Sequence, residues 1–295
     1  MPSNSVYFDS WKSPEKIALL NQQLPEIVEY VGEFGTEIVT FLPFVYNLHM
    51  NGLLENRKIS TYSGMKPYYY FLNRRKLIER MEKRVWVPPG ERWWPSSNEH
   101  QRIPILGELY PKFQKSQSKK DVLFVQNKYC VEWDEGPINY LSLSVLSKIF
   151  EETKGKCRVI YTRQGAISTD TKLGISIDHN IELSFEDLAL CDRYEHVKVL
   201  EKRAFVDFRS YNASKLYWIN RAFLLLGVQG GSNFPWAYFN KPALILHKRG
   251  SETYFSYGQG FYTYLSNPPL QLKVVENDEK LFFEFLKSFK MNSKN

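Results

Sequence analysis

The sequence predicts an α/β protein of two lobes. After residue 120, apolar runs of strand length alternate with segments of helical period, which is typical of a parallel sheet covered by helices on both faces. The stretch 86–117 is rich in Pro, Trp and Ser and has no sustained period, and 115–120 has the composition of a linker. We therefore expect an N-terminal lobe over residues 1–115 and a C-terminal lobe over 116–295.

The N-terminal lobe is expected to hold both helices and strands. Apolar residues at helical spacing predict helices over 16–31 and 38–50. Short runs of β-branched and aromatic residues predict strands over 6–9, 58–62 and 68–71.

The C-terminal lobe shows the more regular alternation. The predicted strands are 122–125, 157–161, 196–200, 223–228 and 243–247, and the predicted helices are 139–152, 213–221, 234–240 and 279–289. Ligands of such sheets bind beyond the carboxyl ends of the strands. The residues that follow each strand are therefore the first place to look for a site.

The turn after the expected strand 223–228 is the most informative local feature. Its residues are Gln229, Gly230, Gly231, Ser232 and Asn233, and a predicted helix follows. Glycine lets the backbone approach a ligand closely, and the first N–H groups of a helix favour a phosphate. The same turn is also a common tight connection in α/β proteins, so both interpretations stay open.

Further polar residues follow the neighbouring strands. Asn127 and Lys128 follow the strand 122–125, Arg163 follows 157–161, and Lys248 follows 243–247. Cations beside a cradle of backbone N–H groups predict a diphosphate site at this edge of the sheet. The alternative is that exposed strand ends simply tolerate charge.

Composition excludes several other classes of protein. The net charge of +7 is dispersed, and no nucleic-acid-binding motif is present, so no nucleic-acid partner is expected. The three cysteines lack CxxC spacing, and neither metal-ligand histidine spacing nor an Asp-x-Asp is present, so we expect no metal and no cofactor. No apolar run has the length of a membrane span and the start lacks a signal pattern, which predicts a cytoplasmic protein.

Motifs along most of residues 30–265 carry a family resemblance. They are Phe34-Gly35-Thr36-Glu37-Ile38, Leu42-Pro43-Phe44-Val45-Tyr46, Asn127-Lys128-Tyr129 with Glu132-Trp133, Pro137 and Asn139, Val159-Ile160-Tyr161-Thr162-Arg163, Tyr211-Asn212, and Val228-Gln229-Gly230-Gly231-Ser232. This set resembles GT-B-type glycosyltransferases of algae, protists and large DNA viruses, a group that includes chlorovirus enzymes, xylosyltransferases among them, that build capsid N-glycans. The stretch 86–110 matches nothing in that group.

The resemblance implies a fold and an activity. The fold would be two Rossmann-like lobes with parallel sheets facing a cleft, with a nucleotide sugar on the second lobe and an oligosaccharide acceptor on the first. The activity would be metal-independent, inverting transfer of xylose from UDP-xylose onto a glycan of a viral capsid glycoprotein. A fucosyl- or other hexosyltransferase of the same fold is the alternative. A carbohydrate- or nucleotide-binding protein without catalysis is another.

Metal-independent sugar transfer needs a base for the acceptor hydroxyl and positive charge for the departing diphosphate. Glu37 is the leading candidate base, with Asp9 and Glu132 behind it, and Gly35 and Tyr46 are expected on the acceptor side. Glutamate in a first helical turn is also favoured by the helix dipole alone. Glu132 could instead order the loop after the first strand of the second lobe or bind the ribose hydroxyls.

Overall fold

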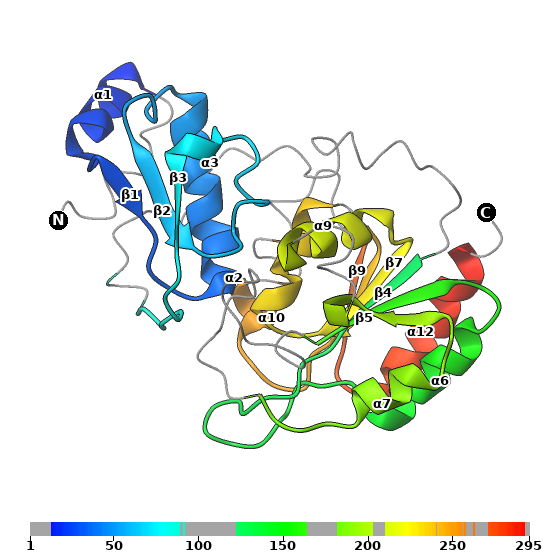
Figure 1. Ribbon diagram of the computed structural model, residues 1–295. Coiled ribbons are helices and arrows are strands. Elements are labelled where there is room, and N and C mark those ends of the chain that lie inside the picture. Colours follow the sequence, from blue (N-terminus) through cyan, green and yellow to red (C-terminus); the bar gives the residue numbers. More distant parts are fainter. Residues whose placement is uncertain are drawn as a thin grey trace. The chain divides into compact units, whose positions relative to one another are not determined.

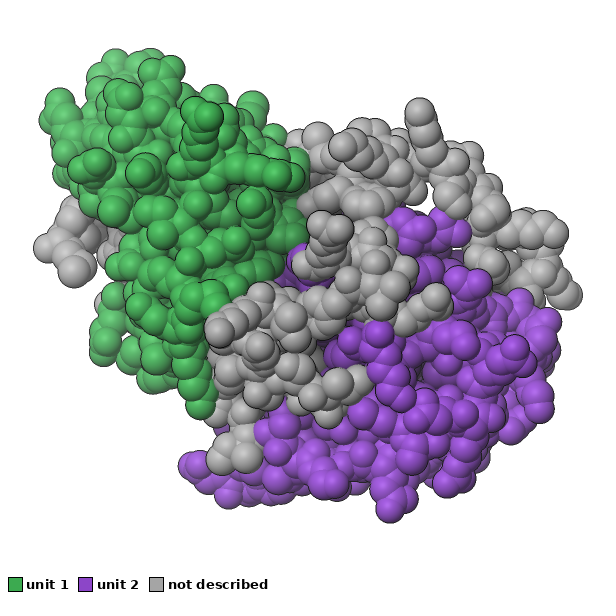
Figure 2. Space-filling view, viewed as in Figure 1, with its two compact units in different colours: residues 1–103, 170–179 green, residues 104–169, 180–295 purple. Residues whose placement is uncertain are grey.

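Two compact units make up the chain in the computed structural model. One unit contains residues 1–103 and 170–179, and the other contains 104–169 and 180–295 (Figure 2). The structure describes residues 13–88, 91, 122–163, 182–202, 210–239, 241–255, 257, 262 and 271–292. The expected strand at 6–9 and the expected boundary near residue 115 lie outside the described residues, so that boundary stays a prediction.

The N-terminal unit contains a parallel sheet in the order β1-β2-β3. Its strands are β1 (Ile27–Glu29), β2 (Lys58–Tyr62) and β3 (Leu77–Arg80), and the helix α1 (Pro14–Gln23) precedes them (Figure 1). The expected strand 58–62 is confirmed. The expected helix 16–31 is wrong beyond residue 23, because Pro25 disfavours the helical conformation of the residue before it.

The aromatic run 68–71 is a turn and not the expected strand. Its rings pack locally, with the Phe71 ring centroid 5.1 Å from that of Tyr46 and the Tyr68 centroid 5.7 Å from that of Phe34. Consecutive aromatic side chains have strand propensity, but here the packing of their rings against a neighbouring helix decides the local structure.

That neighbouring helix is continuous but irregular. It consists of α2 (Phe34–Thr36), a π-helical segment η3 (Glu37–Phe41) and α3 (Leu42–Met50). The Leu42 N–H donates to the carbonyl of Glu37, five residues back. Pro43 has no N–H and its ring would collide with a carbonyl in a regular α-helix, which accounts for a wider turn immediately before it.

The C-terminal unit contains a six-stranded parallel sheet in the order β6-β5-β4-β7-β8-β9. Its strands are β4 (Val122–Gln126), β5 (Arg158–Thr162), β6 (Val197–Val199), β7 (Leu224–Val228), β8 (Ala243–Leu246) and β9 (Leu272–Val275). This is the strand order of a doubly wound Rossmann fold, in which the order reverses between β4 and β7. The predicted α/β fold with parallel sheets is confirmed. The sequence reasoning missed β9 in this sheet, and it missed β1 and β3 in the N-terminal sheet.

Helices cover this sheet on both faces. Leu123 and Val125 of β4 belong to the core shared with α6 (Leu143–Thr153), α7 (Asp187–Asp192) and α12 (Asp278–Asn292). The helix α9 (Tyr211–Arg221) also packs on β4, and in Figure 1 it lies on the other side of the sheet from α6 and α12. No helix of the described part of the chain is long and apolar enough to cross a membrane.

Two helices differ from expectation at their starts. α6 begins at Leu143 and not at Asn139, because the Ser142 hydroxyl caps it by accepting a hydrogen bond from the Val145 N–H at 3.3 Å. The helix after the glycine turn is a 3₁₀ helix, η7 (Gly231–Tyr238), which begins before the expected residue 234 and has Pro235 inside it. A short helix, α10 (Glu252–Phe255), lies between β8 and β9.

Candidate functional site

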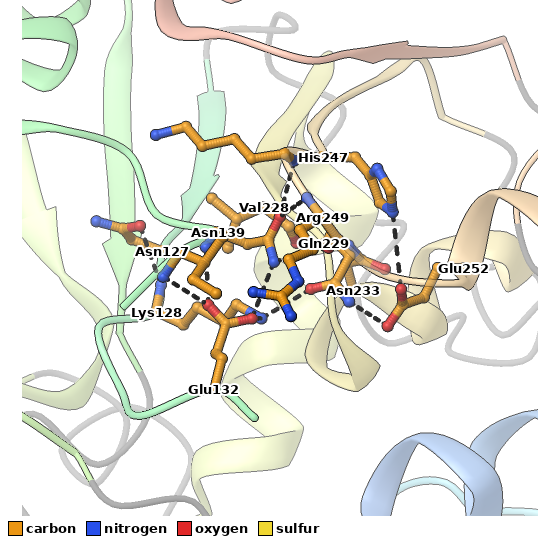
Figure 3. A network of polar contacts seen from close by, with 12 residues as sticks. Asn127, Lys128, Glu132, Asn139, Val228, Gln229, Asn233, His247, Arg249 and Glu252 are labelled. Atoms are coloured by element: carbon orange, nitrogen blue, oxygen red, sulfur yellow. Dashed lines mark hydrogen bonds and ion pairs between the residues drawn. The ribbon is translucent and has the colours of Figure 1, made fainter. Parts of the chain in front are cut away.

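The carboxyl ends of β4, β7 and β8 bring three of the predicted polar segments together. Figure 3 shows the residues after these strands in one network of polar contacts, with Lys128 from the first strand end, Gln229 from the second and His247 from the third. The strands are neighbours at the point where the strand order reverses, which is where doubly wound sheets bind ligands.

Lys128 lies at the centre of this network. Its Nζ atom is 2.6 Å from Glu132 Oε2 and 2.7 Å from Gln229 Oε1. An ammonium group has three N–H donors, so these contacts leave a third for a ligand. The Lys128 side chain is 21% exposed, so it is not sealed inside the protein.

Glu132 is fully engaged within the protein. Its Oε1 accepts the N–H groups of Ile138 and Asn139 at 3.1 and 2.7 Å, and its Oε2 accepts from Lys128 and from the Asn139 amide. Burial acts to raise the pKa of the Glu132 carboxyl, but Lys128 and the Asn139 hydrogen bonds outweigh it and hold the pKa below its usual value. These contacts favour the loop-ordering role of Glu132 over that of a base.

Two asparagines fix the loops around Lys128. Asn127 Oδ1 accepts the N–H of Lys128 at 3.0 Å and that of Leu141 at 2.8 Å, so this buried side chain holds the backbone. Asn139 Oδ1 accepts the N–H groups of Lys248 and Arg249 at 2.8 and 3.1 Å. Asn139 was not predicted as a site residue. Its presence in the same motif as Glu132 was the one sequence feature that could have indicated it.

The glycine turn has a conformation that requires glycine. Gly230 has a φ of 138°, and a Cβ atom there would lie 3.5 Å from Lys128 Nζ. The turn is held by Asn233, whose side-chain amide donates to the Val228 carbonyl at 2.7 Å and whose Oδ1 accepts from Tyr262 at 2.7 Å. η7 begins at Gly231, and the first N–H groups of a helix, here those of Gly231 and Ser232, have no acceptor within the helix.

A chain of polar contacts extends from the turn to α10. The Gln229 amide donates to Glu252, whose Oε2 lies 3.7 Å from His247 Nε2 (Figure 3). Gly250 has a φ of 133°, and a Cβ atom there would collide with the Glu252 carboxylate. Sequence reasoning did not find the His247–Glu252 pair, because these contacts depend on that tight turn.

Arg163 and Lys248 do not join Lys128. Arg163 is buried and forms a bidentate pair with Asp187, with Nε–Oδ2 and Nη2–Oδ1 distances of 2.7 and 3.0 Å. Its Nη1 lies 3.3 Å from Glu182, and burial raises the pKa of Glu182 to about 7 although Arg163 opposes this. Lys248 Nζ lies 3.3 Å from the Tyr140 carbonyl. The structure thus gives Arg163 a structural partner, and its donor-binding role stays a prediction.

A buried lysine supports the glycine turn. Lys215 of α9 is 1% exposed, and its Nζ donates to the Ser232 carbonyl at 2.8 Å. Burial lowers the pKa of Lys215 to about 7, although Glu201 opposes the shift. Glu201 Oε1 accepts from Thr162 at 2.5 Å, and burial raises the pKa of this carboxyl.

Lys215→Met is expected to change how stability depends on pH. Between pH 7 and 10.5 the unfolded chain binds the lysine proton and the folded chain does not, so the free energy of unfolding should rise with pH by up to about 1.4 kcal/mol per unit. Below pH 7 Lys215 is protonated in both the folded and the unfolded chain, so its contribution to the free energy of unfolding does not change with pH. Urea unfolding at pH 7, 8 and 9 should show this rise in the wild type and in the exposed control Lys273→Met, and a flatter curve in Lys215→Met. Parallel curves for all three proteins would contradict it.

In the N-terminal unit, Glu37 is a buried ion-pair residue. Its side chain and that of Arg84 are both 0% exposed, with Glu37 Oε2 and Arg84 Nη2 2.7 Å apart. Glu37 Oε1 accepts from Tyr69 at 2.8 Å and also from Thr61. A base must reach the acceptor hydroxyl, so this geometry gives no support to Glu37 as the base.

The other candidates of this unit are equally enclosed or undescribed. Gly35 is buried within α2, and Tyr46 is buried in α3, where burial raises the pKa of its phenol. Asp9 lies outside the described residues. Within the described ranges, no cluster of three or more His, Cys, Asp and Glu side chains could hold a metal ion.

Comparison with known proteins finds only distant structural likeness. No protein-family model and no curated protein matches the sequence. A family 9 glycosyl transferase from Veillonella parvula is 9% identical with a TM-score of 0.39, over 96% of this chain and 79% of that chain. The ADP-heptose LPS heptosyltransferase II of E. coli is 11% identical with a TM-score of 0.37, over 94% and 80%. S. aureus MnaA with UDP is 11% identical with a TM-score of 0.34, over 100% and 73%. Such identities and TM-scores say nothing about the substrate of this chain.

Proposed function

We propose that the protein is a glycosyltransferase that uses a nucleotide sugar and binds its diphosphate in the C-terminal unit. The observation that carries this proposal is the meeting of Lys128 with the turn Gly230–Ser232 where the strand order reverses. One spare ammonium donor and the first N–H groups of η7 are suited to oxygen atoms of a diphosphate. The same groups would stabilise the negative charge that develops on the leaving diphosphate during sugar transfer.

The family resemblance of the motifs supports a more specific version. It favours metal-independent transfer of xylose from UDP-xylose onto a capsid glycan by a cytoplasmic enzyme, with the acceptor on the N-terminal unit. A fucosyl- or other hexosyl donor remains the alternative within this proposal. UDP-xylose is therefore the first donor to test, ahead of other UDP sugars and of GDP sugars.

One observation favours a second function, that of a nucleotide- or carbohydrate-binding protein without catalysis. Both candidate bases that the structure describes, Glu37 and Glu132, have their carboxylate oxygens occupied by hydrogen-bond donors of the protein itself. Hydrolysis or transfer of the donor sugar by the wild-type protein in excess EDTA would decide for the enzyme. Saturable nucleotide binding with no turnover of any donor would decide for the binding protein.

Lys128→Met is expected to weaken nucleoside diphosphate binding about 10- to 150-fold, the loss of one hydrogen bond to a charged group. The measurement is calorimetric titration with UDP, GDP and CDP. Lys273→Met, which removes an exposed lysine of the same unit, is the control.

Because Lys128 also neutralises Glu132, the unfolding transition of each variant must be recorded beside its affinity. Lys128→Arg should keep most of the binding, since it keeps a cation. Wild-type affinity in a folded Lys128→Met protein would remove the lysine from the site.

A further inference from the structure

The turn after β4 presents a tryptophan in an unusual conformation. Trp133 and Asp134 have φ values of 50° and 61°, in the left-handed region. For a bulky residue this conformation is a genuine outlier, which costs about 1–3 kcal/mol. Trp133 is 49% exposed, so burial offsets little of that cost. The fold therefore holds a large aromatic ring at the surface at some loss of stability.

The surrounding contacts hold this ring in place. Glu132, immediately before it, is tied to Lys128 and to the N–H groups of Ile138 and Asn139. The Arg249 guanidinium lies 5.3 Å from the Trp133 ring centroid, and its Nη1 is 2.8 Å from both carboxylate oxygens of Glu135. One face of the indole thus meets a cation, the Arg249 guanidinium, which is paired with Glu135 and is 53% exposed.

We propose that Trp133 is a stacking platform for the nucleobase of a nucleoside diphosphate bound at the strand ends. This inference rests on the proposed function, since it assigns the base of the same ligand whose diphosphate meets Lys128. The Glu132 carboxylate contacts Lys128 Nζ at 2.6 Å, and the Cα atoms of Glu132 and Trp133 are about 3.8 Å apart. The Trp133 ring also contacts the guanidinium of Arg249, and the Arg249 N–H donates to Asn139 of the same network, so the indole belongs to the group of loops around Lys128.

The chemistry of the ring favours a nucleobase over a sugar. The Arg249 guanidinium draws electron density toward itself through the cation–π contact. A pyranose would present its partly positive C–H groups to the ring and would gain less from an electron-poor indole. A nucleobase presents a π face, and stacking of bases on aromatic side chains tolerates any base identity.

The test is a comparison of UDP with inorganic pyrophosphate. Trp133→Ala should bind UDP roughly 5- to 150-fold more weakly, the loss of one stacked base. Its affinity for pyrophosphate should stay at the wild-type value, because pyrophosphate has no base. Trp133→Phe should retain most of the UDP affinity. If the wild type prefers GDP or CDP over UDP, that nucleotide replaces UDP in the titration.

Two further variants make the result decisive. Trp86→Ala removes an exposed tryptophan of the other unit and should leave UDP affinity unchanged. Trp133→Gly removes the ring, and glycine adopts the left-handed backbone conformation without steric strain. The melting temperature of this variant should therefore equal or exceed that of the wild type, while its UDP affinity falls. This opposite change separates ligand binding from folding.

Three outcomes would overturn the inference. Unchanged UDP affinity in Trp133→Ala would refute it while leaving the proposed function intact. An effect confined to the KM for the acceptor would assign Trp133 to the acceptor and also refute it. A wild-type protein that binds no nucleoside diphosphate would remove both the inference and the proposed function.

Discussion

Glu37→Gln is expected to lower the free energy of unfolding of the N-terminal unit by about 3–5 kcal/mol, as the breaking of a buried ion pair does. The glutamine keeps the shape of the side chain but removes the carboxylate charge that Arg84 Nη2 contacts. Arg84 is 1% exposed, and its Nη2 lies 2.7 Å from Glu37 Oε2. Its guanidinium also lies 4.3 Å from the Tyr62 ring centroid, so it has no route to water without disrupting packed rings.

Chemical unfolding of the variant and the wild type measures this loss. Glu82→Gln is the matched control, because Glu82 forms an ion pair of similar length, 2.9 Å to Arg80, but is 64% exposed. Exposed pairs contribute about 0–1 kcal/mol, so the control should unfold almost as the wild type does. The double variant Glu37→Gln with Arg84→Met should recover much of the loss, because it removes the buried positive charge together with the negative one.

The same variant tests Glu37 as the catalytic base. A base whose proton-accepting oxygen is removed lowers transfer by about two orders of magnitude or more, with donor binding little changed. If Glu37→Gln abolishes transfer while its unfolding free energy equals that of the wild type, Glu37 acts on the acceptor and the ion pair is secondary. If stability falls and the folded fraction transfers sugar at the wild-type rate, the base must be sought among other carboxylates, Asp9 first.

The C-terminal sheet was predictable because its strands are buried on both faces. β7 and all of β4 except its last residue, Gln126, read as apolar runs, and every residue of the two strands is buried. β9 escaped notice because Leu272–Val275 includes an exposed lysine and lies at the edge of the sheet. A short edge strand of mixed polarity has no signal that separates it from a loop.

The place of the candidate site was also predictable, but the pairing of its charges was not. The rule that ligands bind at carboxyl strand ends brings Lys128 and Gln229 to one edge although they are 101 residues apart. Nothing in the sequence shows that Glu132 and Asp187 accept the donors of Lys128 and Arg163. Those partners depend on loop conformations, such as the left-handed turn at Trp133, for which residue type is a poor guide.

Arg163→Ala is expected to lower the free energy of unfolding of the C-terminal unit by about 3–5 kcal/mol, because it leaves the Asp187 carboxylate buried without its cation. The Asp187 side chain is 0% exposed and accepts two hydrogen bonds from Arg163. Tyr161 also donates to Asp187, but a neutral hydroxyl does not compensate a buried charge. Lys202→Ala is the matched control. Lys202 pairs with Asp192, which lies in α7 as Asp187 does, but this ion pair is exposed and should contribute less than about 1 kcal/mol.

Asp187→Asn separates the structural role of Arg163 from a role in diphosphate binding. If Arg163 is structural, Asp187→Asn should destabilise the unit as Arg163→Ala does, and both folded variants should bind UDP as the wild type does. If Arg163 is instead a diphosphate ligand, removing Asp187 frees the guanidinium and UDP binding should tighten. A loss of UDP affinity of about tenfold or more in Arg163→Ala, the size of one charge-assisted hydrogen bond, with intact stability would return Arg163 to the donor site beside Lys128.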